Sequence, residues 1–162
     1  MDGRIAVAPS DIHGLGLRAT AAVAKGELLI RWGGEIVPKS RLEGLKRLAR
    51  YDCAAISEDE IILFALDDPV VRGNHSCDSN LWMADATSIS ARRTIGPGEE
   101  LTIDYGLLSD DAAWTMQCVC GSAACRGVVT GWDWKRPDLQ ERYAGHFVPY
   151  LERRFRGPGR PY

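Results

Sequence analysis

Three cysteines within eight residues are the strongest constraint on how this chain folds: Cys118, Cys120 and Cys125, with Gly121 in the turn between them. The chain has five cysteines, an odd number, and no secretory feature of the sequence argues for a disulfide framework. A buried core thiol explains a lone cysteine such as Cys53, but it explains three neighbouring ones poorly. The cluster therefore indicates metal ligation, and tetrahedral zinc then requires a fourth ligand.

The length of 162 residues fits one domain with a real core. The longest apolar run, Ile61 to Leu66, is far shorter than a membrane span, and the N-terminal residues lack the layout of a signal peptide. We therefore expect a soluble protein of the cytoplasm, or of the nucleus if a eukaryotic cell makes or receives it.

Short apolar stretches separated by turn residues indicate a mainly β protein with a few short helices. Residues 4–37 alternate in this way and predict a strand meander. The other expected elements are a short helix with a capping box (Ser40, Glu43) and a leucine stripe (Leu42, Leu45, Leu48), strands over Ile61–Phe64 and Leu101–Asp104, a helix from Pro137 with Leu139 and Tyr143 on one face, a break or restart at Pro149, and a frayed tail from Arg153 to Tyr162.

The net charge of −2 is unevenly distributed. Residues 52–104 hold eleven acidic side chains against three basic ones, whereas residues 1–51 hold nine basic against five acidic. Such an acidic middle attracts a cationic, lysine-bearing peptide and repels nucleic acid. The alternative is that much of this charge is ordinary solvated surface.

Two further motifs precede the cysteine cluster. Residues 74–80 read Asn-His-Ser-Cys-Asp-Ser-Asn, and residues 100–106 read Glu-Leu-Thr-Ile-Asp-Tyr-Gly. The order and spacing of the three motifs resemble those of the SET-domain protein-lysine methyltransferases with a zinc-binding post-SET tail. That family carries N-H-S-C-x-P-N, then E-E-L-x-F-D-Y, then C-x-C-x4-C-x-G.

The resemblance implies a SET fold, β-clip-like, with a pseudoknot where the first two motifs thread together and a zinc-bound post-SET tail. Asn80, Glu100 and Asp104 would support the fold at that crossing. The expected divisions are a SET domain over 1–108, a post-SET zinc segment over 109–132, and a C-terminal helical extension with a basic tail over 133–162.

Two upstream segments add to the resemblance. Gly14-Leu15-Gly16 matches the G-x-G at the start of a SET domain, and glycine there lets the backbone approach a ligand. Residues 31–36, Arg-Trp-Gly-Gly-Glu-Ile, resemble E-Y-x-G-E-x-I, with Trp32 at the tyrosine position. Trp32 keeps an aromatic wall but lacks the hydroxyl.

By resemblance, the chain uses S-adenosylmethionine and one structural zinc ion. Tyr105 would be the catalytic residue, by positioning rather than as a strong base, and His75 would have no acid-base role. The implied cofactor residues are Gly14, Leu15, Gly16, Asn74 and His75. The implied lysine channel is lined by Trp32, Ile103, Tyr105 and Trp132, where Trp132 or Trp134 packs on the cofactor or channel, or else docks the C-terminal helix. The implied zinc ligands are Cys77, Cys118, Cys120 and Cys125.

Three positions depart from the family pattern. Val71 stands where the family usually has an arginine, with Arg72 displaced by one position. Ser79 replaces the usual proline, and Ile103 replaces a phenylalanine or tyrosine. None of these changes removes a group that methyl transfer requires, although Val71 bears on the geometry of the cofactor pocket.

The function implied is methylation of a lysine side chain in a protein or peptide, such as a histone tail, with two or three methyl groups added. Two alternatives stay open: a catalytically silent SET-like module that binds a peptide, and a zinc-stabilised structural domain without a cofactor. The sequence does not name the substrate protein.

Overall fold

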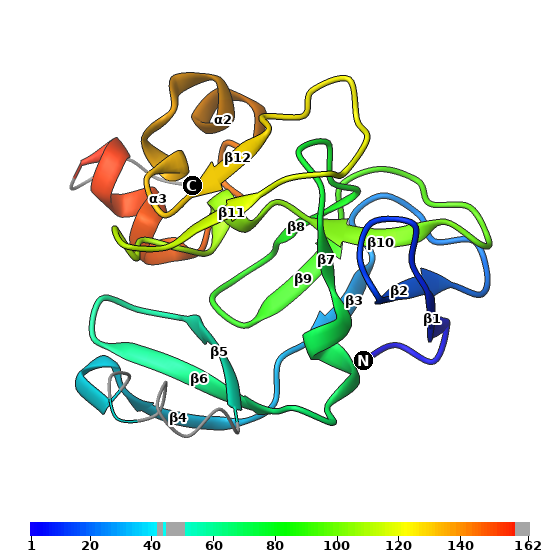
Figure 1. The fold of residues 1–162 in the computed structure, drawn as a ribbon, viewed down its shortest axis with the longest axis horizontal. Helices are drawn as coiled ribbons and strands as arrows, with labels where there is room; N and C mark the ends of the chain where they lie inside the picture. The colour runs from blue at the N-terminus through cyan, green and yellow to red at the C-terminus, as the bar shows by residue number, and fades with distance from the viewer. Residues whose placement is uncertain (42–43, 45–50, 158–162) are drawn as a thin grey trace.

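The computed structural model of this protein describes residues 1–41, 44 and 51–157 (Figure 1). The helix predicted from the leucine stripe at positions 42, 45 and 48 lies outside these residues. The described part is mainly β with two short α-helices, as the sequence predicts. None of its helices is long and apolar enough to cross a membrane.

Seven strands form the main sheet, in the order β1-β2-β10-β8-β9-β3, with β7 also paired to β10. β10 is antiparallel to β2 but parallel to β7 and β8, so the sheet is mixed. The strands are β1 (Ile5–Pro9), β2 (Leu15–Ala19), β3 (Leu28–Arg31), β7 (Asn74–His75), β8 (Leu81–Met83), β9 (Ser88–Ala91) and β10 (Glu100–Ile103).

Two smaller sheets complete the β structure. The order β4-β6-β5 joins β4 (Glu35–Pro38), β6 (Glu60–Ala65) and β5 (Tyr51–Ala55), and every pair is antiparallel. β11 (Thr115–Gln117) and β12 (Val128–Thr130) form a two-stranded ribbon. Figure 1 shows the three-stranded sheet at the lower left and the ribbon in the upper half, beside the C-terminal helices.

Short helical segments follow several strands. The 3-10 helices are η1 (Lys39–Arg41), η2 (Pro69–Arg72), η3 (Tyr105–Leu107) and η4 (Asp133–Lys135). The α-helices are α2 (Pro137–Arg142) and α3 (Pro149–Arg156), and each begins with a proline, which has no N–H to leave unpaired at that position.

The prediction of a frayed tail from Arg153 was wrong for its first residues, because Arg153–Arg156 form the end of α3. The first turn of this helix is fixed by burial of Tyr150, Leu151 and Glu152. The Glu152 carboxylate accepts hydrogen bonds from two backbone N–H groups of the preceding loop, those of Gly145 and Phe147. Because the first turn of α3 is fixed in this way, it supports the following turns, which contain Arg153–Arg156.

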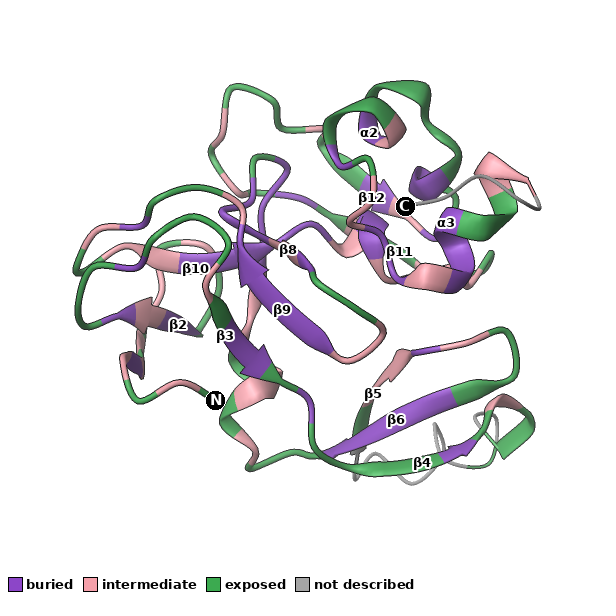
Figure 2. Ribbon diagram, turned by 180° about the vertical axis from the view of Figure 1, so that it is seen from behind, coloured by how far each residue is buried: buried purple, intermediate pink, exposed green. Residues whose placement is uncertain are grey.

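Most buried apolar side chains belong to one core cluster, in which the inner strands of the main sheet meet α2 and α3 (Figure 2). Tyr143, which follows α2, and Tyr150 are fully buried there. A smaller cluster of Val37, Ile61 and Leu63 lies within the three-stranded sheet. The C-terminal helices therefore form part of the core.

Asn80 joins the two segments that cross at β10. Its side-chain N–H donates to the carbonyl oxygen of Glu100 at 2.8 Å, and its oxygen accepts from the N–H of Thr102 at 2.9 Å. Since Asn80 is buried, water cannot replace either bond readily. This amide holds the 74–80 segment in register with β10.

We expect Asn80→Ala to lower the free energy of unfolding by about 2–4 kcal/mol, because two buried backbone groups lose their partner. Denaturant unfolding of the metal-loaded protein measures this change. Glu141→Ala, at an exposed position of α2, is the control and should shift stability by less than about 0.5 kcal/mol. Equal stability of the two variants would contradict the assigned role.

Candidate functional site

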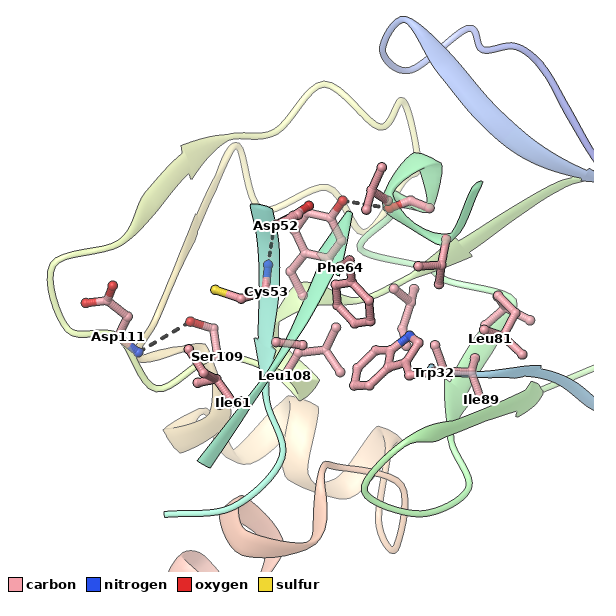
Figure 3. Close-up of a pocket in the computed structure, with 18 of the residues that line it drawn as sticks. Trp32, Asp52, Cys53, Ile61, Phe64, Leu81, Ile89, Leu108, Ser109 and Asp111 are labelled. Atoms are coloured by element: carbon pink, nitrogen blue, oxygen red, sulfur yellow. Dashed lines mark hydrogen bonds between the residues drawn. The ribbon is translucent and has the colours of Figure 1, made fainter. Parts of the chain in front are cut away.

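A pocket of about 350 Å³ lies where the main sheet, the three-stranded sheet and residues 108–114 meet. Its lining is mostly apolar and includes four aromatic residues, Trp32, Phe64, Tyr105 and Trp114. Trp32 and Phe64 pack edge to face, with ring centroids 5.6 Å apart. Figure 3 shows these two rings side by side, with Leu81 and Ile89 beyond Trp32. An apolar pocket of this kind suits an alkyl chain.

Tyr105 lines the pocket at the start of η3, directly after β10 and Asp104. Its hydroxyl donates a hydrogen bond to the carbonyl oxygen of Gly73 at 2.7 Å. Burial, with a smaller contribution from the negative charge of Asp52, raises the pKa of Tyr105 to about 12. The hydroxyl therefore stays protonated at neutral pH, so it positions a partner and does not act as a base.

His75 lies behind Tyr105 with both ring nitrogens engaged. Its Nδ1 accepts from the backbone N–H of Tyr105 at 3.1 Å, which places the ring proton on Nε2, 3.3 Å from the Cys77 sulfur. Burial lowers the pKa of His75, and the nearby carboxylate of Asp104 only partly opposes this. A neutral ring held at both nitrogens has no free site for proton transfer.

Gly14 and Gly16 belong to a segment that the Asn74 side chain holds in place. The Asn74 side-chain nitrogen is 3.1 Å from the carbonyl oxygens of both His13 and Leu15, and 2.8 Å from a carboxylate oxygen of Glu100. Gly14 has a φ of 52°, in the left-handed region that favours glycine. The outer face of this loop is open, because Gly14 and Leu15 are exposed.

The structure gives a reason for glycine at position 16 that the sequence did not show. A β-carbon at this position would lie 2.3 Å from a carboxylate oxygen of Glu100, closer than real contacts allow. The sequence interpretation was that both glycines admit a ligand. In this structure the space beside Gly16 holds a side chain of the protein, and only the outer face at Gly14 and Leu15 remains open.

The four predicted metal ligands come together, although Cys77 is far from the others in sequence. The sulfur atoms of Cys77, Cys118, Cys120 and Cys125 all lie within 4.8 Å of one another. Cys118 Sγ is 3.7 Å from the sulfurs of both Cys77 and Cys125. Tetrahedral zinc with Zn–S bonds of about 2.3 Å requires S···S separations of about 3.8 Å. The cluster therefore fits one tetrahedral, thiolate-binding metal ion.

Backbone groups around the cluster favour thiolates. The N–H of Arg126 donates to Cys77 Sγ at 3.3 Å, and the N–H of Cys77 donates to Cys120 Sγ at 3.5 Å. The effect differs between the cysteines. Burial raises the pKa of the Cys77 and Cys118 thiols. At Cys120 burial also raises the pKa, but hydrogen bonds from Ser122 and from the Cys77 N–H outweigh it and lower that pKa to about 6.

Three of the four predicted channel residues line the pocket: Trp32, Ile103 and Tyr105. Trp132 is not among the lining residues; its side chain is 48% exposed, and the Lys135 ammonium lies over its ring. Trp134 is buried in the core cluster, which matches the alternative of docking the C-terminal helices. Trp114 contributes a wall instead, with its ring centroid 6.2 Å from that of Tyr105.

Phe64 and Trp114 were missed as site residues. Phe64 was predicted to lie in a strand, but the strand is a continuous apolar run, which does not show which face meets the pocket. Trp114 lies between two motifs in a segment without a periodic pattern. Phe64 reaches the pocket through long-range folding, and Trp114 through the turn of the chain between Tyr105 and β11.

Acidic side chains line the rim of the pocket: Asp52, Asp110 and Asp111. Burial raises the pKa of Asp110, but hydrogen bonds from Lys39, Tyr150 and Arg154 outweigh it and hold that pKa below its usual value. Asp110 therefore stays charged and is compensated from three sides. Asp52 is exposed and adds negative potential near Tyr105.

We expect the purified protein to carry one metal ion per chain and Cys125→Ser to lose it, because three thiolates bind more weakly than four. Elemental analysis of freshly purified protein measures the content. Cys53→Ser is the matched control, because Cys53 lies outside the cluster, and it should keep the ion. Full metal content in Cys125→Ser would rule out the ligand set.

The family model described as "SET domain" matches residues 14–106, which contain the glycine loop, the 74–80 motif and Tyr105. The chain is 31% identical over 144 residues to histone-lysine N-methyltransferase TRX1 of Oryza sativa subsp. japonica, covering 78% of this chain and 14% of that protein.

Two further relatives show the same pattern. The chain is 34% identical over 140 residues to histone-lysine N-methyltransferase trithorax of Drosophila virilis, covering 75% of this chain and 4% of that protein. It is 31% identical over 134 residues to the H3 lysine-36 specific histone-lysine N-methyltransferase of Schizosaccharomyces pombe, covering 73% and 16%. The chain thus spans less than a fifth of each of these relatives.

Proposed function

The chain belongs to the SET-domain family, and from that premise we propose that it transfers methyl groups from S-adenosylmethionine to the side-chain amine of a lysine in a protein. The observation that carries the proposal is the position of Tyr105. Its protonated hydroxyl lines an apolar pocket, and its hydrogen bond to Gly73 joins it to the residue before Asn74. The similarity to enzymes named histone-lysine N-methyltransferases supports the same reaction.

The cofactor would lie against the open outer face of the Gly14–Gly16 loop, at Gly14 and Leu15, and against Asn74 and backbone atoms of His75, whose ring is engaged at both nitrogens. These residues fit the role because β2 and β7 both pair with β10, which ends next to Tyr105. When bound, S-adenosylmethionine supplies an electrophilic methyl group on a positive sulfonium. Asn74 would orient the loop that meets it, through the bonds to the carbonyls of His13 and Leu15.

The pocket would prepare the lysine by removing its ammonium from water. A free lysine has a pKa of about 10.4, so at neutral pH the site must favour the neutral amine. Apolar walls lower the pKa of the buried amine, and the proton leaves to water. Trp32, Phe64 and Ile103 supply such walls. Tyr105, whose hydroxyl proton is committed to Gly73, would orient the amine lone pair.

The metal in the cysteine cluster is proposed to be zinc with a structural role. Thiolates from Cys118, Cys120 and Cys125 would attach the 109–132 segment to Cys77, two residues after His75. This attachment would keep Trp114 against Tyr105. Four cysteine ligands leave no open coordination position for a substrate.

The substrate is proposed to be a cationic protein segment, such as a histone tail. The exposed carboxylate of Asp52 lies at the rim of the pocket, where it attracts basic residues flanking the target lysine. The same charge repels a phosphate backbone, so direct contact with nucleic acid is not proposed. The relative from Schizosaccharomyces pombe is named as specific for lysine 36 of histone H3, which supports a histone substrate.

Labelled S-adenosylmethionine, a panel of histones and a cell lysate test the function together, with the modified lysine mapped by mass spectrometry. Methyl transfer to a lysine is the expected result. Cofactor binding without transfer would instead identify a silent peptide-binding module, and absence of cofactor binding would identify a metal-stabilised structural domain.

We expect Tyr105→Phe to lower kcat by about 10²-fold or more while the Kd for S-adenosylmethionine stays within about twofold, because the hydroxyl positions the amine only during transfer. Steady-state kinetics and calorimetry measure the two quantities. Tyr143→Phe, at a buried tyrosine away from the pocket, is the matched control and should keep its activity. A fully active Tyr105→Phe enzyme would refute the assignment.

We also propose that the enzyme adds two or three methyl groups. Ile103 lines the pocket without a hydroxyl and is smaller than an aromatic ring, so the channel has room for a lysine that already carries a methyl. Mass spectrometry at long reaction times with excess cofactor should show di- or trimethyl-lysine, and Ile103→Tyr should shift the product toward monomethyl-lysine. Ile89→Val, on another wall of the pocket, is the control. A wild-type plateau at monomethyl-lysine would show the inference wrong.

A further inference from the structure

A buried arginine connects the cysteine cluster with the catalytic tyrosine. The side chain of Arg126 is 5% exposed and that of Asp104 is fully buried. The guanidinium donates two hydrogen bonds to the carboxylate, Nη1 to Oδ2 at 2.7 Å and Nη2 to Oδ1 at 2.6 Å. Such a two-pronged contact fixes both the distance and the relative orientation of the two groups.

Each member of the Arg126–Asp104 ion pair is next in sequence to a residue of the candidate site. Arg126 follows Cys125, and its own backbone N–H donates to Cys77 Sγ at 3.3 Å. Asp104 precedes Tyr105 and caps η3, because its carboxylate accepts from the N–H of Gly106 at 2.9 Å. The ion pair therefore links the loop that carries the metal ligands to the turn that places the tyrosine ring.

A second carboxylate lies beside the remaining edge of the guanidinium, as a charge contact without a hydrogen bond. Arg126 Nε lies 2.9 Å from an oxygen of Asp133, whose other oxygen accepts from the hydroxyl of Thr130 at 2.9 Å. Burying three charges costs desolvation free energy that their attraction often only offsets. Net stability is thus a poor explanation for this group, whereas defined geometry beside Tyr105 is a good one.

We propose that Arg126 is a positioning residue that transmits the ordering of the metal cluster to Tyr105 through Asp104. The proposal rests on the proposed function for its kinetic consequence but not for its structural one. With the four thiolates bound to one ion, the Cys125–Arg126 backbone is fixed, and the guanidinium holds Asp104 and the first turn of η3. Lysine lacks the planar fork and cannot replace it.

Hydrogen exchange tests the coupling without any need for activity. The backbone N–H of Tyr105 donates to His75 Nδ1. The N–H groups of Gly106 and Leu107 donate to the carboxylate and the carbonyl oxygen of Asp104. Exchange of these three amides therefore reports on the order of this turn. In the wild type, removing the metal with a chelator should raise exchange over residues 104–108. In metal-loaded Arg126→Lys, exchange there should already be raised, and chelation should add little.

Kinetics then test the consequence. Arg126→Lys should lower kcat at least about tenfold, while its metal content, its Kd for S-adenosylmethionine and its KM for the peptide stay within about twofold of wild type. Arg93→Lys is the matched control, because Arg93 makes an exposed ion pair with Glu99 and should leave every quantity unchanged. If neither wild type nor variant methylates a peptide, the proposed function fails, while the exchange measurement still decides the coupling.

Three results would overturn the proposal. The first is wild-type exchange and wild-type kcat in a folded Arg126→Lys, and the second is loss of metal from this variant, which would confine Arg126 to the metal loop. If Arg126→Lys does not fold, the double variant Arg126→Gln with Asp104→Asn replaces the charges by neutral hydrogen-bonding groups and takes its place. Failure of both to fold is the third result, because the ion pair would then serve the fold as a whole.

Discussion

The pairing of β10 along both of its edges is the constraint on which the rest of the structure depends. One edge of β10 pairs with β2, which carries the glycine loop. The other edge pairs with β7 and β8, which precede and follow Cys77 in the sequence. A strand flanked in this way cannot shift its register without moving all three neighbours, and Asn80 fixes that register with two buried hydrogen bonds. Tyr105 lies two residues after the end of β10, so this arrangement fixes its position.

The second organising feature is the way in which the C-terminal third of the chain is attached to the rest. The four cysteines gather the 118–125 loop at Cys77, while α3 contacts residues near the three-stranded sheet. There Arg154 pairs with Glu58 and with Asp110, and Asp110 also binds Lys39 and Tyr150. The three-stranded sheet, the pocket wall and the C-terminal helix are therefore joined by one group of compensated charges, of which Lys39 and Asp110 line the pocket.

Local elements were predicted well, whereas contacts that depend on packing were not. The strands expected among residues 4–37 exist, because apolar stretches and turn residues are local signals. The expectation that they form a meander was wrong: β1 pairs with β2, but β3 pairs with β9 and β4 with β6. Gly16 illustrates the limit: the sequence marks it as special, but its reason is the side chain of Glu100, which lies far along the chain. Trp132 and Trp114 illustrate the same limit, since Trp132 lies on the protein surface and Trp114 on the pocket wall.

The sequence by itself determined the chemistry available to this protein: four cysteines able to bind a metal, a tyrosine after an apolar strand, and a glycine loop. It also determined the family, because these residues occur in a fixed order. Only the tertiary structure decided which side chains meet. The gathering of Cys77 with the later cysteines, the contact of Arg126 with Asp104, and the placing of Trp32 and Phe64 in the same pocket as Tyr105 all join residues more than twenty positions apart. Such contacts follow from the crossing of strands and from packing in the core, and neither leaves a periodic trace in the sequence.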